Sequence, residues 1–250
     1  MACDRDCPIC HGIGWIAYDV DYPHPEFGKM YRCPTASSLT WNDTIGIDLE
    51  EGQLLDWRNF KQTETVTIMQ PELTDLMKNG YGMLYIWGNP GLGKTMAVKS
   101  ATIYAHYKYG MTASYATHAT LFNWLRAAYD TERGQQEYQD RLTILERLQW
   151  LVIDEIGRDR ANDFSKSTLS EILDKRYVGG IAHKTVTILI GNSAPDAYLD
   201  DYQVDRITDN RNKVIHLNTS ESYRKYALDL NGDKDWWKKV KVDKYAEVTQ

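Results

Sequence analysis

The sequence lacks several features that would place it in a specialised class of protein. No apolar run approaches the roughly 18 residues that a membrane-spanning helix needs, and no basic segment followed by an apolar one opens the chain. The formal net charge of −6 excludes a strongly basic protein that coats DNA. We therefore expect a cytoplasmic protein with no membrane partner, in a compartment where thiols stay reduced.

Charge and cysteine are both distributed unevenly along the 250 residues. Residues 1–60 hold ten acidic and four basic side chains, and this difference alone equals the net charge of −6 of the whole chain. All four cysteines lie in the first 33 residues. This distribution predicts an acidic, cysteine-bearing head with its linker at 1–60 and a larger domain at 61–250. Residues 35–70 are typical of a linker, in which residues 48–60 can form a short helix.

The head contains a cluster of residue types that bind metal ions. Cys7 and Cys10 form a Cys-x-x-Cys knuckle, whose spacing lets two thiolates reach one tetrahedral zinc ion. The favoured set of zinc ligands is Cys3, Cys7, Cys10 and Cys33. His11 or His24 can replace Cys3 as the fourth ligand, and the alternatives to zinc are an iron–sulfur cluster or four reduced, unliganded cysteines. We expect removal of zinc to unfold this head, because so short a segment has little core of its own.

A glycine-rich loop lies between a short apolar strand at 83–87 and a helical pattern at 96–109. Its sequence is Gly88-Asn89-Pro90-Gly91-Leu92-Gly93-Lys94-Thr95. The loop matches G-x-x-x-x-G-K-[ST] at every fixed position, in the strand–loop–helix context that this motif requires. Its glycines let backbone N–H groups close around phosphate oxygens, Lys94 reaches the β- and γ-phosphates, and the Thr95 hydroxyl coordinates Mg²⁺. The loop therefore predicts a site for ATP and Mg²⁺.

Two carboxylates follow the apolar run at 150–153, which is typical of a central parallel strand buried on both faces. Ligands of open α/β sheets bind at the carboxyl ends of such strands, so Asp154 is placed to hold Mg²⁺. Glu155 can act as the general base that activates water. Such a carboxylate favours hydrolysis over group transfer. The alternative is a strand followed by an acidic helix cap.

Further strands and helices alternate along the chain. Residues 184–190 are typical of a strand, and Asn192 follows it, where its side chain can touch the γ-phosphate or the attacking water. A turn residue that opens the next helix is the alternative for Asn192. Residues 111–118 indicate another strand, and residues 165–178 a helix. The alternation predicts an α/β fold, with a mostly parallel sheet and helices on both faces.

The phosphate loop, the acidic pair and Asn192 follow the order of Walker A, Walker B and sensor 1, so the chain resembles the AAA+ ATPases. Two further segments are similar to the DnaC/DnaI helicase-loader and IstB-like branch of that family: Asp-Arg-Ile-Thr-Asp-Asn-Arg at 205–211 and Ser-Tyr-Arg at 222–224. The resemblance covers roughly residues 60–230. It implies a P-loop AAA+ core without a C-terminal lid domain, preceded by a small module of the zinc-binding type.

The resemblance also implies a function, that of an ATP-dependent loader of a hexameric replicative DNA helicase onto single-stranded DNA in replication. In that family the N-terminal region binds the helicase, ATP switches the complex, and an arginine finger from one subunit completes the ATP site of its neighbour. Arg211 and Arg206 are the candidates for the finger, with Arg211 favoured, and Arg224 is expected to sense the nucleotide in its own subunit. For each arginine, an ordinary solvated surface charge is the alternative. The alternatives to a loader are an IstB-like ATPase that helps DNA transposition and a nucleotide-binding adaptor with negligible turnover.

Residues 121–141 resemble an extra helical insertion of replication initiators and loaders. Aromatic and basic side chains together suit single-stranded DNA, through stacking on bases and attraction to the backbone. Those in this stretch are Trp124, Arg126, Tyr129, Arg133 and Tyr138. The alternative is an amphipathic helix packed on the ATPase core.

Overall fold

The computed structural model describes residues 15–17, 30–32, 45–47, 64–158 and 163–218. The chain divides into two compact units, Met1–Thr44 and Ile45–Gln250. In the first unit, strands β1 (Trp15–Ala17) and β2 (Met30–Arg32) form an antiparallel pair. The four cysteines proposed as zinc ligands lie outside the described residues, as do the predicted helix at 48–60 and any segment that follows β7.

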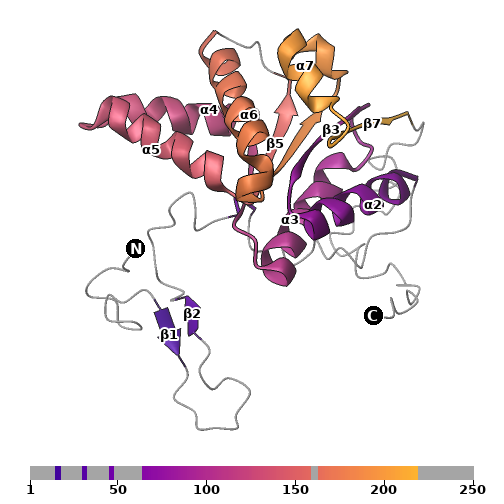
Figure 1. The fold of residues 1–250 in the computed structure, drawn as a ribbon, viewed down its shortest axis with the longest axis horizontal. Coiled ribbons are helices and arrows are strands. Elements are labelled where there is room, and N and C mark those ends of the chain that lie inside the picture. Colours follow the sequence, from indigo (N-terminus) through magenta and orange to yellow (C-terminus); the bar gives the residue numbers. More distant parts are fainter. Residues whose placement is uncertain (1–14, 18–29, 33–44, 48–63, 159–162, 219–250) are drawn as a thin grey trace, which may run out of the picture. The chain divides into compact units, whose positions relative to one another are not determined.

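The second unit is built on a five-stranded sheet in the order β4-β5-β6-β3-β7, in which every neighbouring pair is parallel (Figure 1). The strands are β3 (Gly82–Gly88), β4 (Ala113–Thr117), β5 (Trp150–Ile156), β6 (Val186–Gly191) and β7 (Lys213–Leu217). The predicted α/β class, a parallel sheet with helices, is confirmed.

Helices cover both faces of this sheet. They are α2 (Glu64–Asn79), α3 (Lys94–Tyr109), α4 (His118–Arg126), α5 (Gly134–Arg147), α6 (Asp163–His183) and α7 (Asp201–Ile207), with short 3-10 turns η2 (Ala127–Asp130) and η3 (Pro195–Ala197). Helices α2 and α3 pack on one face, and α6 and α7 lie across the other (Figure 1). None of the described helices is both long and apolar enough to span a lipid bilayer.

The core explains why the strands are nearly continuous apolar runs. Residues 83–86 of β3 are each at most 3% exposed, because their side chains alternate between the two helical layers. On the face of α2 and α3, Leu84 and Ile86 belong to one buried cluster with Leu73 of α2 and Val98 of α3. This rigid sheet fixes the positions of the polar residues at its carboxyl edge.

Several predicted boundaries were wrong by a few residues. Helix α2 begins at Glu64, so the last residues of the predicted linker at 35–70 are helical. Strand β4 ends at Thr117, and the next residue already begins α4. Helix α6 continues past the predicted end at Val178 to His183, through two glycines.

Candidate nucleotide site

The glycine-rich loop connects the end of β3 to the first residue of α3. Gly91 and Gly93 have φ angles of 88° and 83°, a left-handed conformation that side chains disfavour. Gly93 is the N-cap residue of the 16-residue helix α3, whose N-terminus directs N–H groups and its dipole toward the loop. This is the arrangement that binds phosphate groups in proteins.

The ammonium group of Lys94 is folded back against the loop. Its Nζ donates hydrogen bonds to the carbonyl oxygens of Gly88 (2.6 Å) and Asn89 (2.9 Å) and to Oδ1 of Asn192 (3.2 Å). Lys94 is only 6% exposed. The loop lysine and the asparagine after β6, 98 residues apart in the sequence, therefore lie side by side.

The carboxylate of Asp154 is the second centre of the site. Its Oδ2 accepts hydrogen bonds from the hydroxyls of Thr95 (2.8 Å) and Tyr115 (2.6 Å), and its Oδ1 accepts from the backbone N–H of Glu155 (2.6 Å). Asp154 is 2% exposed. The structure thus joins the two residues predicted to hold Mg²⁺. Tyr115 was not among the predicted site residues, and its place within the predicted strand at 111–118 was the signal that the sequence offered.

Glu155 has an unusual backbone conformation at the end of β5. Its φ is 61°, and the pairing of β5 with β6 shifts register between Ile153 and Ile156. A non-glycine residue in this region costs about 1–2 kcal/mol. The Glu155 carboxylate accepts a hydrogen bond from Arg158, and both side chains are partly exposed. The irregular turn therefore points the predicted general base toward an arginine three residues later.

The order of the strands explains how these residues meet. Strand β6 lies between β3 and β5, so the parallel strands deliver the loop, Asn192 and Asp154 to the same edge. The hydroxyl of Tyr85 on β3 donates to the carbonyl oxygen of Ser193 (3.1 Å), next to Asn192. Burial, with the nearby charge of Asp196, raises the pKa of Tyr85 to about 12, so this hydroxyl stays a neutral donor near pH 7.

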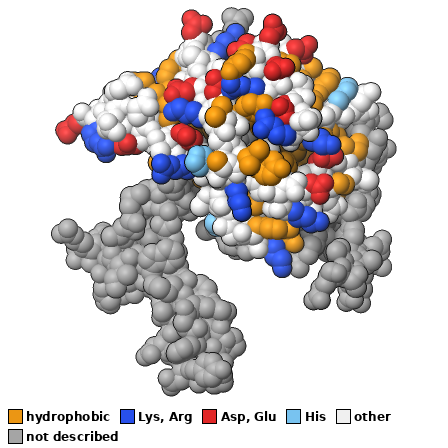
Figure 2. Space-filling model, viewed as in Figure 1, with side chains coloured by type: hydrophobic (Ala, Val, Ile, Leu, Met, Phe, Trp, Pro, Cys, Tyr) orange, Lys and Arg blue, Asp and Glu red, His pale blue; other side chains and the backbone are white. Residues whose placement is uncertain are grey.

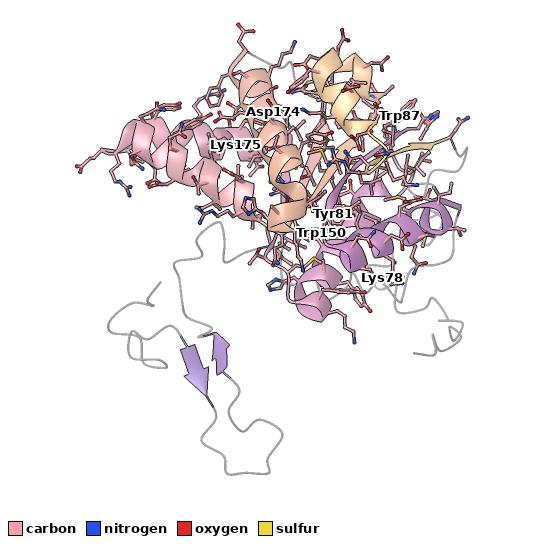
Figure 3. All side chains as sticks on the ribbon, viewed as in Figure 1. Lys78, Tyr81, Trp87, Trp150, Asp174 and Lys175 are labelled. Carbon is pink, nitrogen blue, oxygen red and sulfur yellow. The ribbon has the colours of Figure 1, made fainter. Side chains whose placement is uncertain are left out.

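The two described arginine candidates contact residues outside this site, and Arg211 lies before β7, at the amino-terminal edge of the sheet. Arg206 of α7 is 9% exposed, donates to Asp174 of α6 (Figure 3) and to the Tyr202 hydroxyl, and lies over the Tyr202 ring. Arg211 is more exposed, at 38% of its side chain, and donates to both oxygens of Asp209 (2.9 and 3.2 Å). These bonds hold the pKa of the Asp209 carboxyl well below its usual range.

Arg211 precedes β7, which runs parallel to β3 and pairs Leu217 with Gly88 of the loop. Leu217 is six residues after Arg211, which is roughly 20 Å at the rise of an extended chain. Arg211 is therefore far from the phosphate loop of its own chain. Arg224 lies outside the described residues.

The aromatic and basic side chains at 121–141 contact one another and neighbouring residues of the same domain: Arg126 lies over the Phe164 ring at 5.3 Å, and Arg133 pairs with Asp140 at 2.6 Å. Arg141 lies over the Trp124 ring at 5.0 Å. Tyr138 is 6% exposed, and its hydroxyl bonds to that of Thr168, so it does not face solvent. Tyr129 is 44% exposed and stacks on Tyr138. On the face drawn in Figure 2, Lys and Arg side chains are interspersed with acidic and hydrophobic ones.

The donor atoms at the carboxyl edge fit Mg²⁺. The hydroxyl of Thr95 at the start of α3 and the carboxylate of Asp154 on β5, 2.8 Å apart, are hard oxygen ligands of the kind that Mg²⁺ takes beside phosphate groups. Within the described ranges, no group of three or more His, Cys, Asp or Glu side chains forms a separate metal site.

A segment of the sequence and the fold are similar to those of known proteins. A 76-residue segment is 37% identical to the peroxisomal ATPase PEX6 of Saccharomyces cerevisiae (strain ATCC 204508 / S288c), and it covers 30% of this chain but only 7% of that protein. The crystal structure of the DnaC helicase loader matches with a TM-score of 0.56 and 18% identity, over 68% of this chain and 100% of that one.

The replication initiator DnaA bound to AMPPCP and single-stranded DNA matches with a TM-score of 0.55 and 14% identity. That match covers 74% of this chain and 58% of the DnaA chain, so the present chain spans a little over half of it. The sequence model of the IstB-like ATP binding protein family matches residues 59–228, which is more than half of the chain. The protein therefore belongs to the IstB-like ATP-binding family.

Proposed function

We propose that the protein binds ATP at residues 88–95 and hydrolyses it to ADP and phosphate. The hydrogen bond between Lys94 and Asn192 is the observation that carries this proposal. It joins the phosphate loop after β3 to the residue that follows β6, the strand between β3 and the β5 strand of Asp154. On ATP binding, Lys94 exchanges neutral acceptors for phosphate oxygens. The backbone N–H groups of the loop hold the remaining phosphate charge.

Thr95 and Asp154 would hold Mg²⁺, since their oxygen atoms already lie within 2.8 Å of one another. When bound, Mg²⁺ neutralises charge on the β- and γ-phosphate oxygens and so makes the terminal phosphorus easier to attack. Thr95 orients its hydroxyl hydrogen toward Asp154, which leaves the lone pairs of its oxygen for the ion.

Glu155 would take a proton from the attacking water as the water oxygen bonds to the γ-phosphorus and the bond to the ADP oxygen breaks. Asn192 would orient the γ-phosphate or the water. Glu155 must first leave Arg158, and an exposed ion pair is weak enough for this, at about 1 kcal/mol or less.

This ATPase would act as a switch that loads a hexameric replicative helicase onto single-stranded DNA. The folds of the DnaC helicase loader and of DnaA bound to single-stranded DNA support this role by similarity. The acidic head at 1–60 supports a protein partner rather than a nucleic-acid partner for that region. The exposed Tyr129 and its basic neighbours would supply a weak contact to DNA.

Self-association would complete each ATP site with an arginine from the neighbouring subunit. Arg211 is the better candidate, because Arg206 is nearly buried and Arg211 is far from its own loop. Arg211 lines a cleft with Tyr81 (Figure 3) and Ile181, two exposed apolar side chains that suit a protein contact. Arg224 would sense the nucleotide in its own subunit.

The head would bind zinc through Cys3, Cys7, Cys10 and Cys33, and would recruit the helicase. The Cys-x-x-Cys spacing supports zinc. We expect Cys7→Ser to leave ATP turnover unchanged and to weaken helicase capture.

A second candidate function is that of an ATPase helper of DNA transposition. The match to the IstB-like family favours this candidate as much as the first. A transposition helper would bind duplex DNA and recruit a transposase, whereas a loader would bind the helicase.

Co-migration on a sizing column separates these two functions. The full chain is mixed with its cognate hexameric helicase or with duplex DNA, each with and without Mg²⁺-ATP. We expect a joint peak with the helicase that depends on ATP, and weak retention of duplex DNA. ATP-dependent retention of duplex DNA without a helicase peak would contradict the loader proposal and support the transposition helper.

A further inference from the structure

The geometry points to Tyr115 as a positioning residue that fixes the Asp154 carboxylate for Mg²⁺. Its hydroxyl donates to Oδ2 of Asp154 at 2.6 Å, and both residues are buried, at 6% and 2% exposure. The inference rests on the proposed binding of Mg²⁺-ATP, and it assigns a role to a residue that none of the sequence motifs contains.

The sheet places Tyr115 where only its hydroxyl reaches the site. Tyr115 pairs with Val152 across β4 and β5, and Thr117 pairs with Asp154. The backbone of Tyr115 therefore lies two residues before the level of Asp154, and its long side chain spans that distance. The ring belongs to the same buried cluster as Ala97 and Val98 of α3, the helix that carries Thr95. Tyr115 thus contacts both elements that supply the oxygen ligands: its hydroxyl bonds to Asp154 of β5, and Nζ of Lys99 on α3 lies 4.9 Å from the centre of its ring.

The Tyr115 hydroxyl is one of three described hydrogen-bond donors to the Asp154 carboxylate. A carboxylate has about four acceptor positions. Two hydroxyls occupy Oδ2 and one backbone N–H occupies Oδ1, so the open position lies on Oδ1. Without the Tyr115 hydroxyl, the Thr95 hydroxyl would be the only one of these donors left on Oδ2. The carboxylate would then rotate more freely, and the Thr95 hydroxyl would lose its fixed acceptor.

The backbone of Tyr115 is held from its outer side as well. Its N–H donates to the carbonyl oxygen of Ile45 at 2.8 Å, so residues 45–47 extend the pairing beyond the edge strand β4. Gly46, at φ 67°, lies so close that an added Cβ would come within 1.9 Å of the Tyr115 carbonyl oxygen. A backbone fixed on both sides gives the side chain a rigid base, which a positioning residue needs.

The test is Tyr115→Phe in the full chain, which removes the hydroxyl and keeps the ring. The affinity for a fluorescent ATP analogue is measured as a function of Mg²⁺ concentration, and again with the Mg²⁺ chelated. We expect the Mg²⁺ concentration at half-maximal effect to rise about tenfold or more, as is usual when a hydrogen bond to a metal ligand is lost. The affinity without Mg²⁺ should change by less than about twofold.

Tyr138→Phe is the matched control, because it also removes a buried tyrosine hydroxyl bonded to another hydroxyl, away from the loop. It should leave the Mg²⁺ dependence unchanged. If the Mg²⁺ concentration at half-maximal effect is unchanged in Tyr115→Phe, the inference about Tyr115 is overturned and the proposed binding of ATP is not. An equal loss with and without Mg²⁺ would also overturn it, since that indicates a general structural role. If the affinity of the unaltered protein for the ATP analogue does not depend on Mg²⁺, both the inference and the proposed function are overturned.

Discussion

At the scale of single residues, Lys94 holds a positive charge in a nearly closed site with two backbone carbonyls and one amide oxygen as its acceptors. The glycine-rich motif was sufficient to predict Lys94 and Thr95, because their roles depend on neighbours in the sequence. Tyr115 was not predictable in the same way. Its contact with Asp154 depends on β4 lying beside β5 and on the length of a ring, which no local pattern records.

Lys94→Ala should weaken ATP binding by at least about 30-fold, because a charge-assisted hydrogen bond contributes about 2 kcal/mol or more. Fluorescence titration with an ATP analogue measures the change. Lys175→Ala on α6 (Figure 3), a partly exposed lysine paired with Glu171, is the control and should bind normally. Unchanged binding in Lys94→Ala would mean that the nucleotide binds elsewhere.

Arg158→Ala should raise ATP turnover modestly, because it frees the Glu155 carboxylate from its ion pair. The gain should not exceed about fivefold, since an exposed pair contributes about 1 kcal/mol or less. Steady-state phosphate release measures it, with the exposed Lys166→Ala as the control. A loss of more than tenfold would show instead that Arg158 acts directly on the nucleotide.

At the scale of elements, the strands were easier to predict than the helices. Strands buried on both faces leave long apolar runs, and residues 150–153 are such a run. Helix α2 was missed because Pro71 interrupts its sequence, although the buried Met69 and Leu73 have helical spacing. Asn192 and Lys94 are neighbours because β6 lies beside β3 in the sheet. The order of strands cannot be obtained from a single sequence, so their contact was not predictable from it.

Arg176 of α6 connects three elements through hydrogen bonds from a guanidinium that is 2% exposed. It donates to the Leu148 carbonyl after α5 (2.8 Å), and on β6 to the Val186 carbonyl (2.7 Å) and the Thr187 hydroxyl (2.7 Å). It also donates to the carbonyl oxygen of Leu145. Burial lowers the pKa of Arg176 to about 9, so it stays charged near pH 7.

Arg176→Met should lower the free energy of unfolding by at least about 3 kcal/mol, because several buried carbonyls lose their donor together. Urea denaturation followed by circular dichroism measures this. The adjacent Lys175→Met is partly exposed and should cost less than about 1 kcal/mol. Equal stabilities of the two variants would contradict the connecting role of Arg176.

At the scale of the whole molecule, the ATP site and Arg211 occupy opposite edges of one sheet. One chain therefore cannot bring its own Arg211 to its own nucleotide, and a ring or filament of subunits can. In the proposed switch, ATP binding and assembly would therefore depend on each other. The resemblance of the arginine segments to a known family suggested this arrangement, and the sequence alone could not distinguish Arg206 from Arg211.

Ile181→Asp should weaken self-association in Mg²⁺-ATP by at least about tenfold, because burial of one isoleucine contributes about 1.5 kcal/mol or more. Ile181 is 56% exposed and lines the cleft of Arg211. Ile68→Asp, on α2 and 38% exposed, is the control on the other face of the sheet. Sedimentation velocity over a range of protein concentrations measures the self-association of each variant. If Ile68→Asp disrupts assembly and Ile181→Asp does not, the interface lies on the α2 face.

The claim that this site hydrolyses ATP is tested most directly by the turnover of Glu155→Gln. A base catalyst contributes about 10²–10⁴ in rate, so turnover should fall at least about 100-fold while ATP affinity stays within about threefold. Glu171→Gln, a partly exposed carboxylate paired with Lys175, should hydrolyse ATP normally. Turnover in Glu155→Gln within threefold of the unaltered protein would contradict the assignment of Glu155 and place the base elsewhere.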